Sequence, residues 1–313
     1  MKAFYTDHFV LPLPEGHRFP MAKYRLTRES VSHLPQISLT EAPAATDTEL
    51  LLAHDPVYLQ RVITGTLSPQ AQREIGFPWS EAMVERSRRS VGATIAATLA
   101  ASTEGVAVNL AGGTHHAYRD KGSGFCVFND AVVAARVMQR RHGIKRIGII
   151  DLDVHQGNGT ASIVKNDPTI FTLSMHGEKN FPFRKEPGDI DIGLPDGCDD
   201  ATYLEALDAA LRRFTQRFDA DLLIYLAGAD PHEGDRLGRL QLSLDGLYQR
   251  DQIVFDFAAR QCLGVAVTMA GGYGHDINQT VAVHTQTVHV ALTHWQRTSN
   301  AGNRLKPAME ITE

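Results

Sequence analysis

Two carboxylates and an imidazole stand at alternate positions directly after a short β-branched run. They are Asp151, Asp153 and His155, and the run is Arg146–Ile150. Such a run predicts a buried strand. Side chains at positions i, i+2 and i+4 of an extended chain point to the same side, so the three groups should converge at the strand's carboxyl end. Carboxylates there are costly unless a metal ion or a polar partner compensates them, and the pattern therefore favours a metal site over a solvated strand end.

A further candidate ligand, Asp230, follows the apolar run Leu222–Leu226. Together with Asp153 and His155 it would supply two carboxylate oxygens and one imidazole nitrogen. Three protein ligands and an open fourth position are typical of a catalytic zinc site. Because oxygen ligands also accept Fe²⁺, the identity of the metal is less determined than its presence. Asp230 taken alone could instead cap the turn that follows it.

Two adjacent histidines, His115 and His116, follow a Gly-Gly pair. Opposite a metal site they suit acid–base chemistry, in which one imidazole takes a proton from the attacking water and later returns it to a leaving amine. Each needs a partner on its other ring nitrogen, and Asp151 and Asn158 are the candidates. An anionic partner raises the pKa of an imidazole, whereas a neutral one does not. We therefore predict that the base is the histidine paired with Asn158 and that the histidine paired with Asp151 is cationic.

Tyr273 lies in a Gly-rich turn after the apolar run Val265–Met269. It could be a packing residue. Aimed at the metal, its phenol could donate a hydrogen bond to a carbonyl oxygen as negative charge develops there. A metal, a water, a base and a phenol donor are together the requirements of amide hydrolysis.

Strands and helices alternate along the chain, which predicts a single-domain α/β fold with a mainly parallel central sheet flanked by helices. Strands are expected at 3–6, 106–110, 146–150, 170–174, 222–226 and 265–269, and helices at 22–33, 49–64 with a break at Pro56, 80–102, 130–142, 159–165, 201–218, 245–262 and 276–296. Segment 176–199 is expected to be an irregular loop. Sites in such folds lie beyond the carboxyl ends of the strands, where four turns carry the candidate residues.

The composition is that of an ordinary globular protein, with 43% hydrophobic and 21% charged residues and a net charge of −5. This charge argues against a nucleic-acid partner. No stretch is apolar enough for a membrane span, and the N-terminus lacks the apolar core of a signal peptide. Cys126, Cys198 and Cys262 are odd in number and widely spaced, which indicates thiols of a reducing compartment, so we expect a cytoplasmic protein.

Five motifs together resemble the zinc-dependent histone deacetylase and acetylpolyamine amidohydrolase superfamily, which has an arginase-like, three-layer α/β fold. They are GTHHAYRDKGSGFCVFND, DLDVHQGNG, SMH, GADPHEGDRLGRLQLS and AGGYG. The resemblance implies a catalytic domain over residues 1–298 and a tail over 299–313. Gln156 stands where most relatives carry another histidine. With the EGDRLGRL run and the short chain, it makes the sequence most similar to the class IV branch and its bacterial relatives.

The resemblance implies a role for each candidate residue. The zinc ligands fall on Asp153, His155 and Asp230. His116 matches the general base, oriented by Asn158, while His115 pairs with Asp151, and Tyr273 matches the transition-state tyrosine. The substrate tunnel is expected to be lined by Gly124, Phe125, Phe181 and Gly271. Many members also hold a structural potassium ion, which here would use the side chains of Asp151 and Ser174 and the carbonyls of Asp153, His155 and Met175.

Two other functions are compatible with parts of the pattern. A binuclear manganese ureohydrolase needs further carboxylates where this chain has Gly157 and Gly228, so we reject that alternative. A catalytically silent binding protein for acyl-lysine or a metabolite could keep the metal but lose the base or the tyrosine, and both are present. The expected substrate is an acetyl- or longer acyl-lysine in a peptide or protein, or a small acylated amine such as an acylpolyamine. An acidic rim for a polyamine could be built from Glu178, Glu186 or Asp189, although charged loops are usually just solvated. The oligomeric state is not readable from the sequence.

Overall fold

The computed structural model describes residues 1–300 and Leu305, and it is built around one eight-stranded parallel sheet. The strand order is β2-β1-β3-β8-β7-β4-β5-β6. The strands are β1 (Lys2–Tyr5), β2 (Ser38–Glu41), β3 (Val106–Asn109), β4 (Ile147–Asp151), β5 (Ile170–Gly177), β6 (Ile190–Leu194), β7 (Leu222–Leu226) and β8 (Gly264–Thr268). This confirms the predicted three-layer α/β architecture.

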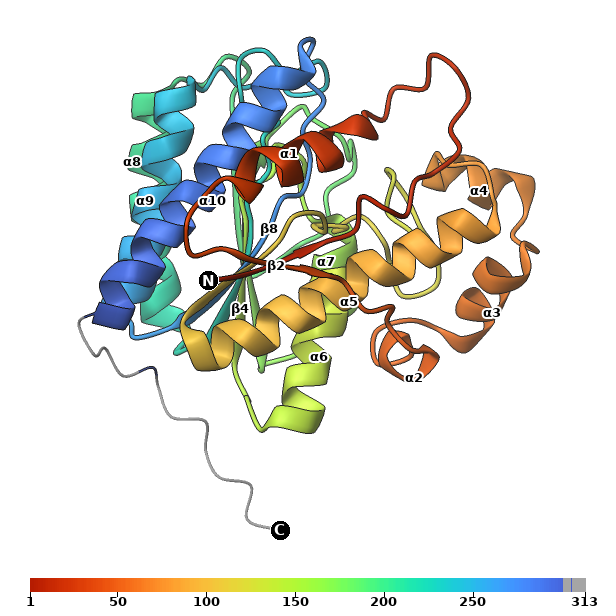
Figure 1. Cartoon of the computed structure of the whole chain (residues 1–313), viewed down its shortest axis with the longest axis horizontal. Helices are drawn as coiled ribbons and strands as arrows, with labels where there is room; N and C mark the ends of the chain where they lie inside the picture. Colours follow the sequence, from red (N-terminus) through yellow and green to blue (C-terminus); the bar gives the residue numbers. More distant parts are fainter. Residues whose placement is uncertain (301–304, 306–313) are drawn as a thin grey trace.

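Helices cover both faces of the sheet, as the central strands require (Figure 1). The helices are α1 (Ala22–Ser32), α2 (Asp47–Leu50), α3 (Pro56–Thr64), α4 (Pro69–Ile75), α5 (Glu81–Glu104), α6 (Asp130–His142), α7 (Asn158–Val164), α8 (Asp200–Arg217), α9 (Leu244–Arg260) and α10 (Ile277–Asn300). One layer contains α5 and α6, and the other contains α1, α8, α9 and α10. Every residue of β3, β4, β7 and β8 is buried, which is the pattern of parallel strands covered on both sides.

The long helix α5 shows how the sequence sets the packing of one layer. Its N-terminus is capped by Ser80, whose side chain accepts a hydrogen bond from the backbone N–H of Met83. Gly92 then lets the helix approach the segment after β2, because a Cβ there would lie 1.9 Å from the carbonyl oxygen of Pro43. The break predicted near Pro56 is also present, with Asp55 capping α3 by accepting from two backbone N–H groups.

The structure differs from the sequence-based expectation mainly at the edges. The edge strand β6 lies in the segment 176–199 that we expected to be an irregular loop, and neither the other edge strand, β2, nor helix α4 was predicted. β2 is mostly exposed, so it lacks the apolar run that marks a central strand. Helix α10 continues through Asn300, and the rest of the predicted tail 299–313, apart from Leu305, lies outside the described residues. Within the described residues, no helix is both long and apolar enough to cross a membrane.

Sheet register brings the candidate residues to one edge of the sheet. Strands β3, β8, β7 and β4 are consecutive neighbours, with Asn109 level with Thr268 and Asp151 level with Leu226. All four strands run in the same direction, so the turns that follow them lie next to one another. These four turns contain the histidine pair, Tyr273, Asp230 and the Asp153–His155 segment.

Candidate active site

The turn after β4 is folded by its own carboxylates. The strand ends at Asp151, so Asp153 and His155 are not on an extended strand as we had predicted. Instead, Asp153 Oδ1 accepts a hydrogen bond from the backbone N–H of His155 at 2.9 Å, and Asp230 Oδ1 accepts from that of Val154 at 2.9 Å. Asp153 Oδ2 accepts from the Gly271 N–H at 2.7 Å. These bonds join three of the four turns and aim their side chains at one point.

Asp153, His155 and Asp230 form a buried cluster that fits a metal ion. Each offers one ligand atom, and these atoms all lie within 4.8 Å of one another. Asp230 Oδ2 has no hydrogen-bond partner among the described residues, although it lies 3.2 Å from His155 Nδ1. A buried carboxylate oxygen without such a partner is costly, and a cation bound to it would remove the cost. The two carboxylates and one imidazole match the donor set of a three-ligand zinc site.

The pKa values of the cluster residues also indicate that a positive charge is favoured between the two carboxylates. Burial and the nearby charge of Asp153 raise the pKa of Asp230 to about 7. Burial alone would lower the pKa of His155, but its hydrogen bond to Asp153 and the nearby charges of Asp153 and Asp230 raise it to about 10. Both shifts show that the two carboxylates favour a positive charge between them. A metal ion would supply that charge.

The two histidines have the two different partners that we predicted. His115 Nδ1 lies 2.6 Å from Asp151 Oδ2, and His116 Nδ1 lies 2.7 Å from Asn158 Oδ1. Burial opposes the charge of His115, but the carboxylates of Asp151 and Asp153 raise its pKa to about 9. Burial and two neighbouring imidazoles instead hold the pKa of His116 well below its usual value. One member of the pair is therefore cationic near neutral pH and the other is neutral.

Tyr118, which sequence reasoning missed, fixes the orientation of the Asn158 amide. Asn158 Nδ2 donates a hydrogen bond to the Tyr118 hydroxyl at 2.9 Å, so Oδ1 is left to face His116. That oxygen can only accept, and His116 must therefore carry its proton on Nδ1. The other nitrogen, Nε2, is then unprotonated. Tyr118 lies within the GTHHAYRDKGSGFCVFND motif, but its residue type alone gave no sign that it would orient Asn158.

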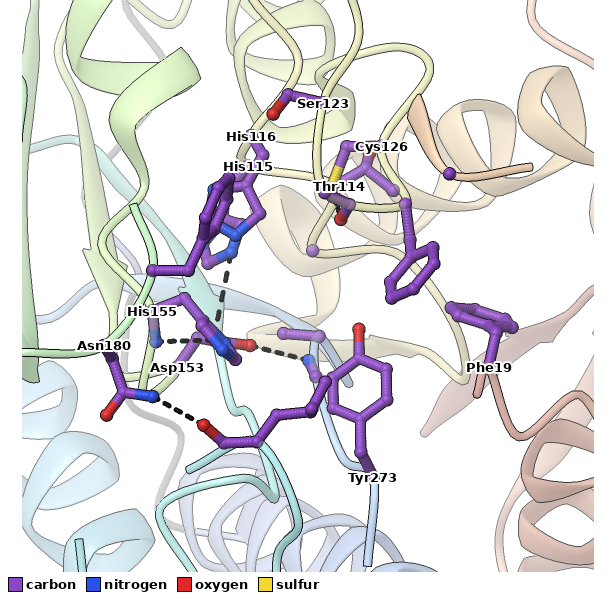
Figure 2. Close-up of a pocket in the computed structure, with 18 of the residues that line it drawn as sticks. Phe19, Thr114, His115, His116, Ser123, Cys126, Asp153, His155, Asn180 and Tyr273 are labelled. Carbon is purple, nitrogen blue, oxygen red and sulfur yellow. Dashed lines mark hydrogen bonds and ion pairs between the residues drawn. The ribbon is translucent and has the colours of Figure 1, made fainter. Parts of the chain in front are cut away.

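Tyr273 lies in the wall of the cavity, and both polar groups of its backbone are hydrogen-bonded. Its N–H donates to Asp235 Oδ2 at 2.6 Å, and its carbonyl accepts from Arg236 Nε at 2.8 Å. Figure 2 shows its hydroxyl pointing into the cavity between the histidines and Phe19. Burial, with a contribution from the nearby carboxylates, holds the pKa of the phenol well above its usual value. The hydroxyl is therefore a neutral hydrogen-bond donor.

Lys23 binds the backbone of the turn that carries Tyr273, a role that sequence reasoning did not predict. Its ammonium is buried and donates to the carbonyls of Ala270 and Gly272, both at 3.2 Å. It lies 5.3 Å from the centroid of the Tyr273 ring. The residue comes from the proline-rich N-terminal third, where no pattern distinguishes a buried lysine from an exposed one.

Two members of the cluster, Asp153 and His155, line a single cavity of about 700 Å³ together with the two histidines and Tyr273 (Figure 2). All four residues predicted for the tunnel also line it, namely Gly124, Phe125, Phe181 and Gly271. The Phe181 ring lies edge-on to His116 with centroids 4.9 Å apart. Phe19, which was not predicted, completes an aromatic wall with Phe125 at 5.3 Å. The size falls in the range of small-molecule and side-chain pockets.

There is no room for the carboxylates of a second metal at the two glycines that we singled out. A Cβ at Gly157 would lie 2.4 Å from Asp151 Oδ2, and one at Gly228 would lie 2.8 Å from Asp230 Oδ1. A larger side chain would therefore displace Asp151, the partner of His115, at the first position and Asp230 at the second. The geometry agrees with the rejection of a binuclear site.

Other predicted residues lie around this centre. The sheet register places Ser174 level with Asp151, and the Ser174 hydroxyl lies 3.0 Å from His176 Nδ1. Gln156 is buried and clamps the loop that carries Phe181, because its amide bonds both the N–H and the carbonyl of Glu186 at 2.9 and 2.7 Å. The three cysteines are free thiols, as expected.

The predicted acidic rim is wrong, because none of its three candidates lines the cavity. The backbone of Glu186 is hydrogen-bonded by the Gln156 amide, and its carboxylate accepts from the Tyr118 hydroxyl at 3.5 Å. The carboxylate of Asp189 accepts from the backbone N–H of Thr172 at 2.9 Å. Glu178 is exposed and packs beside Gly193 on β6. These acids serve the local structure of the loop after β5.

Comparison with known proteins agrees with this geometry. Residues 15–288 match the histone deacetylase domain family. The chain is 44% identical over 286 residues to an uncharacterized protein of Picosynechococcus sp., covering 90% of this chain and 95% of that one. It is 33% identical to a histone deacetylase-like amidohydrolase of Pseudomonas aeruginosa, covering 84% and 74%. The structure of an HDAC homolog from Aquifex aeolicus superposes with a TM-score of 0.79 at 25% identity, covering 93% and 83%.

Proposed function

The chain belongs to the histone deacetylase family, and on this premise we propose that it is a zinc-dependent amidohydrolase that removes an acyl group from acyl-lysine or a related N-acylated amine. The observation that carries the proposal is the buried Asp153–His155–Asp230 cluster, of which Asp153 and His155 line the same cavity as His116 and Tyr273. A zinc ion at this cluster would polarise the acyl carbonyl and make a water molecule acidic enough to react near neutral pH.

In this proposal His116 is the general base. Its ring is neutral, and the Asn158–Tyr118 hydrogen bonds leave Nε2 free to accept the proton of the attacking water. His115, charged and held by Asp151, stabilises the negative charge that develops on the substrate. The histidine pair then returns a proton to the leaving amine. The opposite pKa shifts of the two rings support this division of roles.

Tyr273 is the electrophilic partner in this scheme. Its neutral hydroxyl donates a hydrogen bond to the acyl carbonyl oxygen as that oxygen becomes negative. Its tied backbone holds the donor in place before the substrate arrives, so little reorganisation is needed during the reaction. Phe125 and Phe181 enclose the methylene groups of the acylated side chain.

Three finer features belong to the same proposal. A structural potassium ion would lie beside Asp151 and Ser174, which the sheet register places on neighbouring strands. The class IV-like character rests on Gln156 and the length of the chain, and it stays a prediction. Free thiols at all three cysteines support a reducing, cytoplasmic location.

The test is a panel of fluorogenic acetyl-, octanoyl- and myristoyl-lysine peptides together with acetylputrescine, assayed with zinc-loaded protein. We expect Tyr273→Phe to lower kcat by about 10²- to 10³-fold, as loss of an oxyanion-hole donor does. Tyr248→Phe, at a half-exposed tyrosine of α9 outside the cavity, is the matched control and should leave kcat unchanged. The fastest substrate would identify the acyl length and the amine. Zinc binding without turnover of any substrate would favour a catalytically silent binding protein.

A further inference from the structure

The mouth of the cavity is lined by cations that come from five separate segments of the chain. They are Arg18 before α1, Arg73 on α4, Lys121 after the histidine pair, Lys179 after β5 and Arg239 after β7. All five side chains are exposed. Outside the metal cluster, Glu74 is the one carboxylate that lines the same cavity among the described residues. The entrance is therefore positive, whereas the chain as a whole carries a net charge of −5.

Most of this positive charge is not neutralised locally. Lys179 and Arg239 share a single carboxylate, that of Asp196, at 3.8 and 3.2 Å. The Lys121 ammonium lies over the ring of Tyr118, 4.6 Å from its centroid, which leaves its charge intact. Within the described part of the chain, neither Arg18 nor Arg73 forms an ion pair with a carboxylate. This differs from α5 and α8, where half-buried Arg89 and exposed Arg212 each pair with an acid one helical turn away.

The mouth also carries an exposed apolar side chain outside the tunnel. Phe183 lines the cavity and is 85% exposed, with its ring 6.4 Å from that of Phe181. Monomeric surfaces contain many single apolar residues, but here the ring stands at the entrance next to the tunnel wall. A small acylated amine would occupy the tunnel and leave both Phe183 and the outlying cations uncovered. A peptide on either side of an acyl-lysine would cover them.

We propose that this mouth selects acyl-lysine in acidic peptide segments, whose Asp or Glu side chains lie beside the cationic residues while the acylated side chain enters the tunnel. The inference rests on the proposed deacylase function and names its substrate class. Clefts lined by one sign of charge concentrate oppositely charged ligands and raise their association rates. The same field disfavours acylpolyamines, whose remaining amines are cationic.

The test compares three acetyl-lysine peptides of one length, with Asp, Asn or Lys at the two positions on each side of the acetyl-lysine. At low ionic strength we expect kcat/KM for the acidic peptide to exceed that for the basic peptide by about tenfold, falling toward about twofold near 0.5 M salt because exposed charges are screened. Equal values for the three peptides at low salt, or a preference for the basic one, would overturn the proposal.

Double charge-reversal variants test whether the preference for the acidic peptide arises at the mouth. Arg18→Glu with Arg73→Glu should abolish or invert the preference for the acidic over the basic peptide. The matched control, Arg140→Glu with Arg213→Glu, makes the same charge change near the ends of α6 and α8. These helices lead into β4 and β7, so both control residues lie at the amino edge of the sheet, opposite the site. An equal loss of preference in the control pair would mean that net charge, and not the mouth, is responsible.

A binding measurement separates this proposal from the proposed function. Fluorescently labelled copies of the three peptides are titrated with zinc-loaded Tyr273→Phe protein, and anisotropy gives the Kd of each. The acidic peptide should bind most tightly even if no turnover is found in any variant. Equal Kd values would refute the charge selection, whereas ordered Kd values without turnover by the wild-type protein would refute only the hydrolytic function.

Discussion

His54 provides a quantitative prediction about the segment that positions the histidine pair. Its ring is 1% exposed, with Nδ1 lying 3.0 Å from the carbonyl oxygen of Tyr118 and Nε2 accepting from the Asn129 N–H at 2.9 Å. Asn129 in turn donates to the carbonyls of His115 and Ala117. One ring nitrogen therefore donates to a carbonyl and the other accepts from an N–H, which only the neutral imidazole can do. Burial lowers the pKa of His54 to about 4.

The lowered pKa makes the protein less stable in acid. An unfolded chain has a histidine pKa of about 6.5, so between pH 6.5 and 4 the unfolded state binds a proton that the folded state does not. Stability from this residue is fully present above pH 6.5 and is lost as pH falls. With these two pKa values the loss at pH 5 is about 2 kcal/mol, and it approaches about 3.4 kcal/mol well below pH 4.

Urea unfolding of the wild-type protein and of His54→Gln at pH 8 and pH 5 measures this effect. Glutamine keeps a donor and an acceptor but does not titrate. The variant should be less stable at pH 8, and the difference in unfolding free energy should narrow by about 2 kcal/mol at pH 5. Contributions from other titrating groups cancel in this comparison. If the difference in unfolding free energy is the same at both pH values, the folded protein does not hold His54 in its neutral form, and the prediction is refuted.

Three further substitutions test how the site is supported. Tyr118→Phe removes the acceptor that orients the Asn158 amide, so kcat should fall about fivefold, the equivalent of one neutral hydrogen bond, while KM and zinc content stay the same. An unchanged kcat would show that the amide is held by other means. Gln156→Ala releases the loop that carries Phe181, and we expect a higher KM for acyl-lysine peptides with zinc content unchanged. Gln156→Leu, which fills the space without hydrogen bonds, should behave like the alanine variant, and wild-type KM in either would contradict a clamping role. Gly92→Ala places a methyl group against the Pro43 carbonyl and should destabilise the protein by about 1–3 kcal/mol in urea unfolding, whereas Leu99→Ala, at a partly exposed position of the same helix, should cost less.

The central site was predictable because its signals are local. Asp153, His155 and the histidine pair occur in short runs, each directly after an apolar strand, and parallel strands bring such runs to one edge of the sheet. Even so, the assumed geometry of the metal turn was wrong. It is made by carboxylate-to-backbone hydrogen bonds after β4 has ended, and no alternation of side chains along a strand is involved.

The supporting residues were not predictable from local patterns. Phe19 and Lys23 come from a proline-rich segment whose burial depends on contacts with residues about 250 positions away, such as Ala270 and Gly272. The edge strands β2 and β6 were missed for a related reason, since only one of their faces or neither is buried. The five cations at the mouth were not predicted either, because they come from separate loops and helices that meet only in the folded chain.

The measurement that tests the central claim most directly is a zinc titration of chelator-treated protein, followed by hydrolysis of an acetyl-lysine peptide. The Asp153–His155–Asp230 cluster predicts no turnover without metal and a rate that rises linearly until one zinc is bound per chain. Fe²⁺ should substitute at the same stoichiometry if it is accepted. Full activity after complete removal of metal, or a rate that keeps rising to two ions per chain, would contradict the account.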